Sequence, residues 1–307
     1  MRKKVFIIGN GFDLDLGWYT SYKDFYKSKY WPLKSFNLFC PMANYLKNRT
    51  EIDCWYDLEG LFKKYASTSL HNQSEANPED EPLFNKIRES LILFLKEEEQ
   101  NPVNPDSMAI KVLKAVVANG LFSSIYTFNY TDLHGVAEKA GIKSKFNYES
   151  VHGCVAKQSI ILGVDDNAEL REGYSFLRKV FSPFYRSHSI RFDLQECDEV
   201  VFFGHSLGEM DYPYFADFFK AQSECSERKY GKIITIFTKD NISRIRILEQ
   251  LRRMNKCQTE RLLNDNDFKL IMVDNPDNIV INQFFDHLKK DSLSEYNRKR
   301  YPGISCV

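Results

Sequence analysis

Short apolar runs without polar–apolar alternation most strongly constrain what this chain can fold into. A strand with one face in water alternates, whereas a parallel strand covered by helices on both faces is apolar throughout. We therefore interpret the runs as buried parallel strands. They are Lys4–Gly9, Ser124–Asn129, Ser159–Gly163, Glu199–Gly204, Lys232–Thr238 and Lys269–Asp274.

Amphipathic segments with helical spacing lie between several of these runs. Gly120 and Gly141 follow two of the segments, as glycine often does at the end of a helix. The predicted helices are Met108–Asn119, Thr131–Ala140, Ile242–Met254 and Asn278–Lys290. Because strand and helix alternate, we expect an α/β fold: a Rossmann-like open parallel sheet with helices on both faces.

The stretch between the first two predicted strands is too long for a single crossover helix. We expect one domain over residues 1–307 that contains a helical insertion over residues 32–119. A piece of this insertion, His71–Pro82, is rich in Asn, Ser, Glu and Pro, and this composition predicts a loop.

The charge balance narrows the range of partners. The chain has 42 Lys+Arg and 42 Asp+Glu, so its formal net charge is zero. A nucleic-acid backbone selects for a basic excess, and a membrane helix needs about 20 apolar residues in a row. We therefore expect that the protein binds neither nucleic acid nor a membrane. The aromatic content of 14% suits a thick core or a buried homo-oligomer interface.

The cysteines are scattered and form no Cys-x-x-Cys pair, which a zinc site or a disulfide framework would favour. We expect reduced thiols in a cytoplasmic protein without a metal. The seven positions are Cys40, Cys54, Cys154, Cys197, Cys225, Cys257 and Cys306.

Polar residues gather where predicted strands end, which is where open α/β sheets bind ligands. The clusters are Gly9–Asp13, Thr127–Asp132, Val151–Gly153 and Gly204–Pro213, of which the third follows no predicted strand but lies between two apolar stretches. The glycines of the first cluster let the backbone approach a ligand and offer amides to phosphate. The third glycine of a dinucleotide fingerprint is absent, because Leu14 stands in its place. Taken singly, each cluster also fits a turn or a structural histidine.

The fourth cluster matches the G-x-S-x-G nucleophile elbow of α/β-hydrolases over Gly204–Gly208. An elbow serine begins a helix almost at once. Here Pro213 suits the first turn of a helix and Asp211 its N-cap, so the helix is expected to start near Tyr212. A loop then separates it from Ser206, and the serine hydrolase is a secondary hypothesis.

Taken together and in this order, the clusters resemble the AbiH family of bacteriophage abortive-infection proteins. The matching segments are IIGNGFDLDLG with Thr20-Ser21-Tyr22, Trp55–Glu59, TFNYTD, VHG and GHSLGEMDYP. This family is in turn similar to sirtuin-like NAD-binding domains, which carry a glycine loop, an asparagine, a His-Gly and a Gly-x-Ser-Leu in the same order.

The resemblance implies a nucleotide site, with NAD as substrate or ligand. Gly9, Asn10, Gly11, Phe12 and Asp13 would form a loop over the pyrophosphate and the nicotinamide ribose. Ser206 would hydrogen-bond the phosphate or ribose on the adenosine side.

The resemblance also implies hydrolysis at the nicotinamide–ribose bond, as in an NAD glycohydrolase. Asn129 would orient the ribose or the attacking water, and His152 would act as general base. Asp13 and Asp132 are further candidates for holding the nicotinamide amide or the ribose. His205 is a second candidate base or a phosphate ligand.

One departure from the sirtuins narrows this activity. The paired cysteines of the deacylase zinc module are absent, since Cys154 is followed next by Cys197. Protein deacetylation is therefore disfavoured. The family implies a defence protein that answers a phage-derived or host trigger. A nucleotide-sensing module without turnover and a serine hydrolase using Ser206 are the alternatives.

Overall fold

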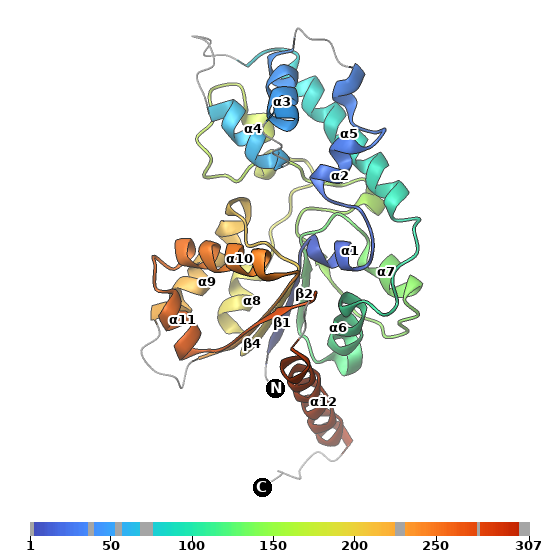
Figure 1. The fold of residues 1–307 in the computed structure, drawn as a ribbon, viewed down its shortest axis with the longest axis vertical. Coiled ribbons are helices and arrows are strands. Elements are labelled where there is room, and N and C mark those ends of the chain that lie inside the picture. The colour runs from blue at the N-terminus through green and yellow to red at the C-terminus, as the bar shows by residue number, and fades with distance from the viewer. Residues whose placement is uncertain are drawn as a thin grey trace.

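Six strands form one parallel sheet in the order β3-β2-β1-β4-β5-β6 (Figure 1). The computed structural model describes residues 3–35, 40–52, 57–67, 76–224, 231–274 and 277–300. The strands are β1 (Lys4–Ile8), β2 (Ser124–Thr127), β3 (Glu149–Ser150), β4 (Glu199–Phe203), β5 (Ile233–Thr238) and β6 (Asp267–Met272). The Rossmann-like open sheet expected from the sequence is thereby confirmed.

Helices cover both faces of the sheet (Figure 1). One face carries α6 (Met108–Val117), α7 (Leu133–Lys139) and α12 (Asn278–Arg300), and the other carries α8 (Ile190–Glu196), α9 (Tyr212–Glu224), α10 (Asn241–Met254) and α11 (Thr259–Asp265). Successive residues of β1 serve the two cores in turn: Phe6 and Ile8 face the first, Val5 and Ile7 the second. This is why the run is apolar without alternation.

Five of the predicted strands are confirmed, with ends shifted by a few residues, but the strand predicted at Ser159–Gly163 is wrong. Ile160 and Leu162 are buried in the core of the helical layer above the sheet, so their apolar character reflects burial there. The sequence also missed β3, which has only two residues, neither of them apolar.

A helical layer lies above the carboxyl ends of the strands (Figure 1). It contains α2 (Tyr22–Lys27), α3 (Pro41–Ile52), α4 (Leu58–Ser67) and α5 (Asp80–Glu98), whereas the short α1 (Gly11–Asp15) follows β1 directly. Residues of the stretch 155–177 share its hydrophobic core. By contrast α6, which falls inside the predicted insertion, packs against the sheet. Trp55, Tyr56 and the first part of the predicted 71–82 loop lie outside the described residues.

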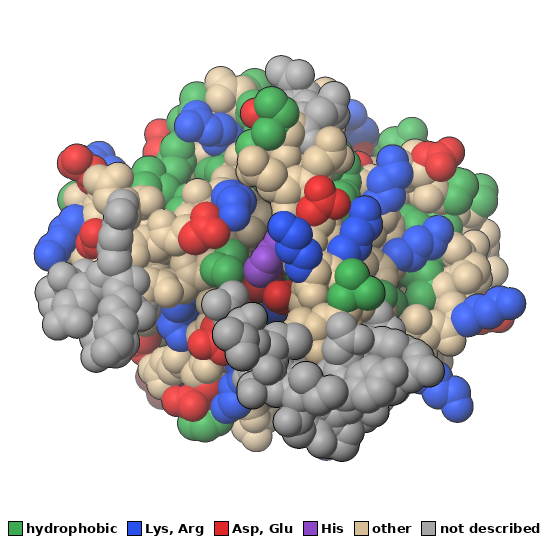
Figure 2. Space-filling model, turned by 90° about the horizontal axis from the view of Figure 1, so that it is seen from below, with side chains coloured by type: hydrophobic (Ala, Val, Ile, Leu, Met, Phe, Trp, Pro, Cys, Tyr) green, Lys and Arg blue, Asp and Glu red, His purple; other side chains and the backbone are tan. Residues whose placement is uncertain are grey.

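The surface carries charges of both signs (Figure 2), and the described cysteines are free thiols. Figure 2 shows the end of the molecule opposite the helical layer, where both basic and acidic side chains lie on the surface. Cys40, Cys154 and Cys197 are buried free thiols and Cys257 is an exposed one, while Cys54, Cys225 and Cys306 lie outside the described residues. No helix within the described ranges is long and apolar enough to cross a membrane.

Candidate functional site

The strand order reverses between β1 and β4, and the loops that follow these two strands touch. The amide of Gly9 donates to Phe203 O at 3.0 Å, and that of Gly11 donates to Gly204 O at 2.8 Å. A Cβ atom on Gly9 would lie 2.5 Å from His205 Cα, so only glycine fits there. These two amides are therefore already bonded, contrary to the expectation that they meet a phosphate. The glycines provide the contact between the loops instead.

A cavity of about 1020 Å³ opens between this edge of the sheet and the helical layer. Most of the predicted site residues line it: Gly9, Asn10, Gly11, Asp13, Asn129, His152, His205 and Ser206. Phe12 and Asp132 do not. Phe12 is buried against Phe203 in the core below, and Asp132 caps α7 and accepts a hydrogen bond from the Tyr148 hydroxyl at 2.6 Å.

Asp13 is the centre of a buried polar cluster at the cavity. It accepts hydrogen bonds from Asn129 Nδ2 and from the Thr131 hydroxyl, each at 2.8 Å. Only 1% of Asp13 is exposed, and burial raises its pKa to about 7 against the opposing effect of the bonds from Thr131 and Asn129. The bond to Asp13 uses one of the two hydrogens on Asn129 Nδ2, so the carbonyl oxygen and the second N–H of this amide remain for a ligand.

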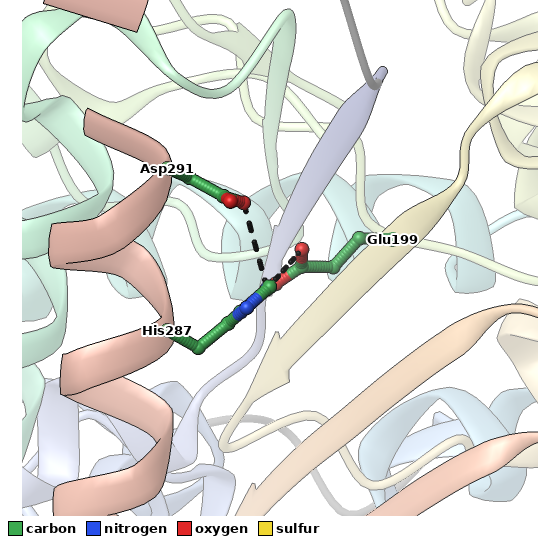
Figure 3. A group of neighbouring side chains, drawn as sticks. All are labelled: Glu199, His287 and Asp291. Carbon is green, nitrogen blue, oxygen red and sulfur yellow. Dashed lines mark hydrogen bonds and ion pairs between the residues drawn. The ribbon is translucent and has the colours of Figure 1, made fainter. Parts of the chain in front are cut away.

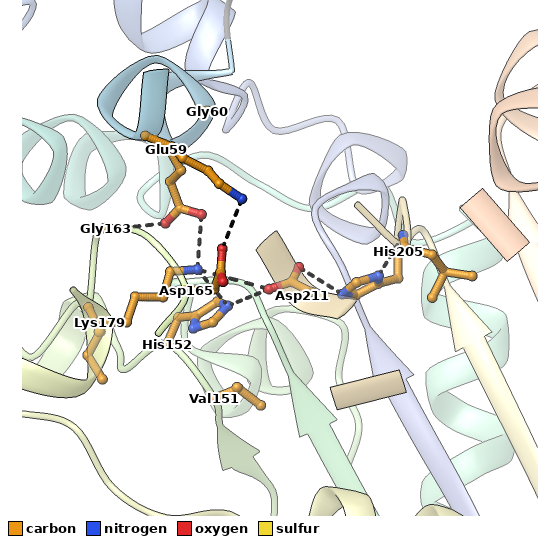
Figure 4. A network of polar contacts seen from close by, with 12 residues as sticks. Glu59, Gly60, Val151, His152, Gly163, Asp165, Lys179, His205 and Asp211 are labelled. Carbon is orange, nitrogen blue, oxygen red and sulfur yellow. Dashed lines mark hydrogen bonds and ion pairs between the residues drawn. The ribbon is translucent and has the colours of Figure 1, made fainter. Parts of the chain in front are cut away.

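A second polar network joins the sheet to the helical layer through His152 and Asp211 (Figure 4). His152 Nε2 lies 3.0 Å from Asp211 Oδ1, and His205 Nε2 lies 3.4 Å from Asp211 Oδ2. Lys179 Nζ lies 3.4 Å from His152 Nε2 and 3.0 Å from Glu59 Oε2 on α4. The network thus connects the ends of β3 and β4 with the layer above them.

The charges of this network keep His152 neutral. Burial, and then the charge of Lys179, lower its pKa to about 4. Burial would raise the pKa of Asp211, but the hydrogen bond from His152 and the charge of Lys179 hold it well below its usual range. An ionised carboxylate only accepts, so His152 Nε2 carries the hydrogen and Nδ1 is the basic nitrogen.

Several side chains at or beside the cavity were given no role from the sequence, although Glu59 ends the matching segment Trp55–Glu59. Glu59 is buried at the cavity, and burial raises its pKa to about 7 although the charge of Lys179 opposes this. A charged residue on the otherwise buried face of α4, beside Leu58 and Leu61, was the signal for Glu59. Lys179 follows no motif, so the sequence contains no signal that marks it as part of the network. Four further basic residues line the cavity: Lys23, Lys63, Lys64 and Arg246.

The surroundings of Ser206 do not form a nucleophile elbow. The side chain is exposed, and no histidine of the described chain lies within hydrogen-bond distance of its hydroxyl. His205 Nδ1 instead accepts the amide of Leu207 at 3.0 Å. A 3₁₀ turn at Glu209–Asp211 separates Ser206 from α9, which begins at Tyr212 as predicted.

A third polar cluster lies at the opposite end of the sheet (Figure 3). The donor atoms of Glu199, His287 and Asp291 are all within 4.8 Å of one another, as metal ligands would be. Lys4 Nζ lies 2.5 Å from both Glu199 Oε2 and Asp291 Oδ2. A lysine ammonium is therefore the cation of this cluster, which ties α12 to β1 and β4.

The open parallel sheet defines a Rossmann-like α/β protein, and its cavity lies at the strand-order reversal, where such sheets bind ligands. Residues 5–230 match the family model of bacteriophage abortive infection AbiH, and the chain belongs to this family. Membership implies a part in phage defence by abortive infection. No curated protein matches the chain. The matched residues contain every cavity-lining residue except Arg246.

Proposed function

We propose that the cavity binds NAD or a related nucleotide and hydrolyses its nicotinamide–ribose bond. The observation that carries this proposal is that Asn129 and His152, from the ends of neighbouring strands, line one cavity at the strand-order reversal. Ligand sites in open α/β sheets lie at this point, and the strand order is that of dinucleotide-binding folds. The volume of about 1020 Å³ is sufficient for a dinucleotide.

The chemistry assigns one task to each of these side chains. Departure of neutral nicotinamide leaves positive charge on the ribose, and water then adds its oxygen to the anomeric carbon. His152 Nδ1 accepts the proton of that water, because the hydrogen bond from Nε2–H to Asp211 leaves Nδ1 as the basic nitrogen. The carbonyl oxygen of Asn129, held by Asp13, orients the water or a ribose hydroxyl.

The basic residues of the cavity supply charge for the phosphates. Lys63 is already paired with Glu209 at 3.0 Å and Asp165 at 3.4 Å. Arg246 is exposed on α10 and has no carboxylate within ion-pair distance among the described residues. The lining as a whole is not basic, because five carboxylates line the cavity beside the four basic residues: Asp13, Asp57, Glu59, Glu209 and Asp211. The phosphates would therefore meet positive charge only locally, at these basic side chains.

Nicotinamide release from NAD, followed by chromatography, tests the proposed reaction. Asn129→Ala and His152→Ala should each slow release by about 100-fold or more, the usual worth of a positioned base or a charge-stabilising amide. Ser206→Ala is the matched control and should retain most activity. Wild type and both cavity variants releasing nicotinamide at one rate would contradict the assignment, and loss of activity in Ser206→Ala alone would favour the serine hydrolase.

A nucleotide sensor without turnover is the second candidate. It is favoured by the low pKa of His152, about 4, because a base that weak takes up a proton poorly near neutral pH. Calorimetry with ADP-ribose and NAD separates the two functions. Binding without nicotinamide release would favour the sensor. If neither ADP-ribose nor NAD binds, both functions are overturned.

A further inference from the structure

Asp13 differs in its partners from Glu59 and Asp211, two other carboxylates at the cavity. Glu59 pairs with Lys179 at 3.0 Å, and Asp211 lies 3.0 Å from His152 and 4.0 Å from Lys179. Within the described ranges, by contrast, Asp13 has no lysine, arginine or histidine nitrogen within ion-pair distance. Its hydrogen-bond donors, Asn129 and Thr131, are neutral.

A buried carboxylate without a cation is costly, since burial disfavours its charge and neutral donors only partly replace water. Asp13 bears this cost at the wall of the cavity, where its side chain is almost completely buried. The charge of a buried carboxylate acts over several ångströms because little solvent screens it. A positive group in the cavity next to Asn129 would therefore be attracted by Asp13 without touching it.

We propose that Asp13 selects the positively charged, oxidised nicotinamide ring over the neutral dihydronicotinamide ring, the charge of the ligand completing the balance of this buried carboxylate. This inference rests on the proposed function and makes it more specific. The same charge favours the ribose cation during bond cleavage, since positive charge moves from the pyridinium ring to the ribose as nicotinamide leaves. Asp13 acts here through space and through its hold on Asn129.

Proton release on binding is a direct consequence. With a pKa of about 7, Asp13 is partly protonated near neutral pH, and a cationic ligand would drive its proton off. Thr20, Asn129 and Thr131 face Asp13 with neutral groups, and Glu99 is the charged group beside it. Across the cavity lie Glu59, His152, His205 and Asp211, and Lys179 lies behind them in the same network. A neutral ring should displace no proton from Asp13.

Calorimetry with NAD and NADH tests this selection, in the His152→Ala background so that NAD is not consumed. We expect NAD to bind about tenfold more tightly than NADH, as one partly screened charge pair allows. Near neutral pH, only NAD should release protons, measured by comparing two buffers of different ionisation enthalpy. Asp13→Asn should bring the affinity ratio close to one and reduce the release; Glu59, the other carboxyl at the cavity whose pKa is raised to about 7, accounts for the release that remains.

Asp80→Asn is the matched control. Asp80 is equally buried and also has neutral donors, the hydroxyls of Tyr65 and Tyr174 at 2.8 Å each, but it does not line the cavity. It should leave the affinity ratio unchanged. Equal affinities for NAD and NADH without proton release would overturn the selection while leaving nucleotide binding intact, and this result needs no Asp13 variant. Failure of both nucleotides to bind would overturn the proposed function together with the selection.

Discussion

Glu199 and Asp13 are two buried carboxylates at opposite ends of the same pair of strands, and they are neutralised differently. Glu199 begins β4 directly opposite Lys4 in the sheet register, and Lys4 Nζ lies 2.5 Å from its carboxylate. Asp13 follows β1 at the other end and has only neutral donors among the described residues. Lys4 thus neutralises the buried carboxylate at one end of the sheet, whereas the Asp13 carboxylate at the other end lies at the cavity without a cation among the described residues.

The pKa values follow this difference. Burial acts on both carboxyls and would raise both values. For Glu199, the hydrogen bond from His287 and the charge of Lys4 outweigh burial and lower its pKa. For Asp13, burial dominates and the pKa rises to about 7. We therefore expect the Lys4–Glu199 pair to stabilise the fold, and we expect the charge of Asp13 to reduce stability at the proposed ligand site.

Removal of the cation at the Glu199 end should have the largest effect. Lys4→Met leaves Glu199 buried without its charged partner, which should lower the free energy of unfolding by about 3–5 kcal/mol. Urea denaturation measures this. Lys3→Met is the matched control, because the Lys3–Glu196 pair is about half exposed at 3.6 Å, and it should change stability by less than about 1 kcal/mol. Equal effects of the two variants would show that the Glu199 cluster is not structural.

Removal of the charge at the Asp13 end should have a smaller effect of opposite sign. The pKa of Asp13 is about 7 in the folded protein and 3.8 in the reference state, so the wild type loses stability as pH rises between these values. Asp13→Asn should therefore gain about 1–4 kcal/mol at about pH 8, less what the altered hydrogen bonds cost.

The sign of this effect is the discriminating feature. Below about pH 4, where Asp13 is protonated in both states, the variant should gain nothing from the lost charge. Denaturation series at the two pH values measure the difference. A variant that is less stable than wild type at the higher pH would mean that Asp13, like Glu199, serves the fold.

The smallest effect is expected at the rim of the cavity. Arg246→Ala removes an exposed charge, so NAD should bind about two- to fivefold more weakly, and this loss should fade in high salt. Arg252→Ala, an exposed arginine on the same helix that does not line the cavity, is the control. Binding titrations at low and high salt make the comparison. An equal loss in both variants would remove Arg246 from the site.

Much of the sheet and part of the site could be predicted from sequence. The apolar runs of β1 and β4 are unambiguous because both faces of each strand are buried. Ile160 and Leu162 misled because burial in a helical core and burial in a sheet leave the same apolar signature. The two-residue edge strand β3 carries no such signature at all.

The site residues divide in the same way. Asn129 ends a predicted strand, so sheet topology alone predicts its place at this edge. His152 follows β3, which the sequence did not reveal, so only the His-Gly motif indicated it. Lys179 and Glu59 lie 120 residues apart in the sequence and meet only through the packing of the helical layer. No local sequence pattern encodes that contact. The pKa values of Asp13 and His152 depend on burial, which a sequence does not specify residue by residue.

A crystal structure of the His152→Ala variant with NAD bound would test the central claim most directly. We expect the nicotinamide ribose within about 3 to 4 Å of the Asn129 carbonyl oxygen and of the space vacated by the His152 ring. We also expect the nicotinamide ring on the Asp13 side of the cavity. A nucleotide bound outside this cavity, or with its adenine in place of its nicotinamide beside Asn129, would contradict the claim.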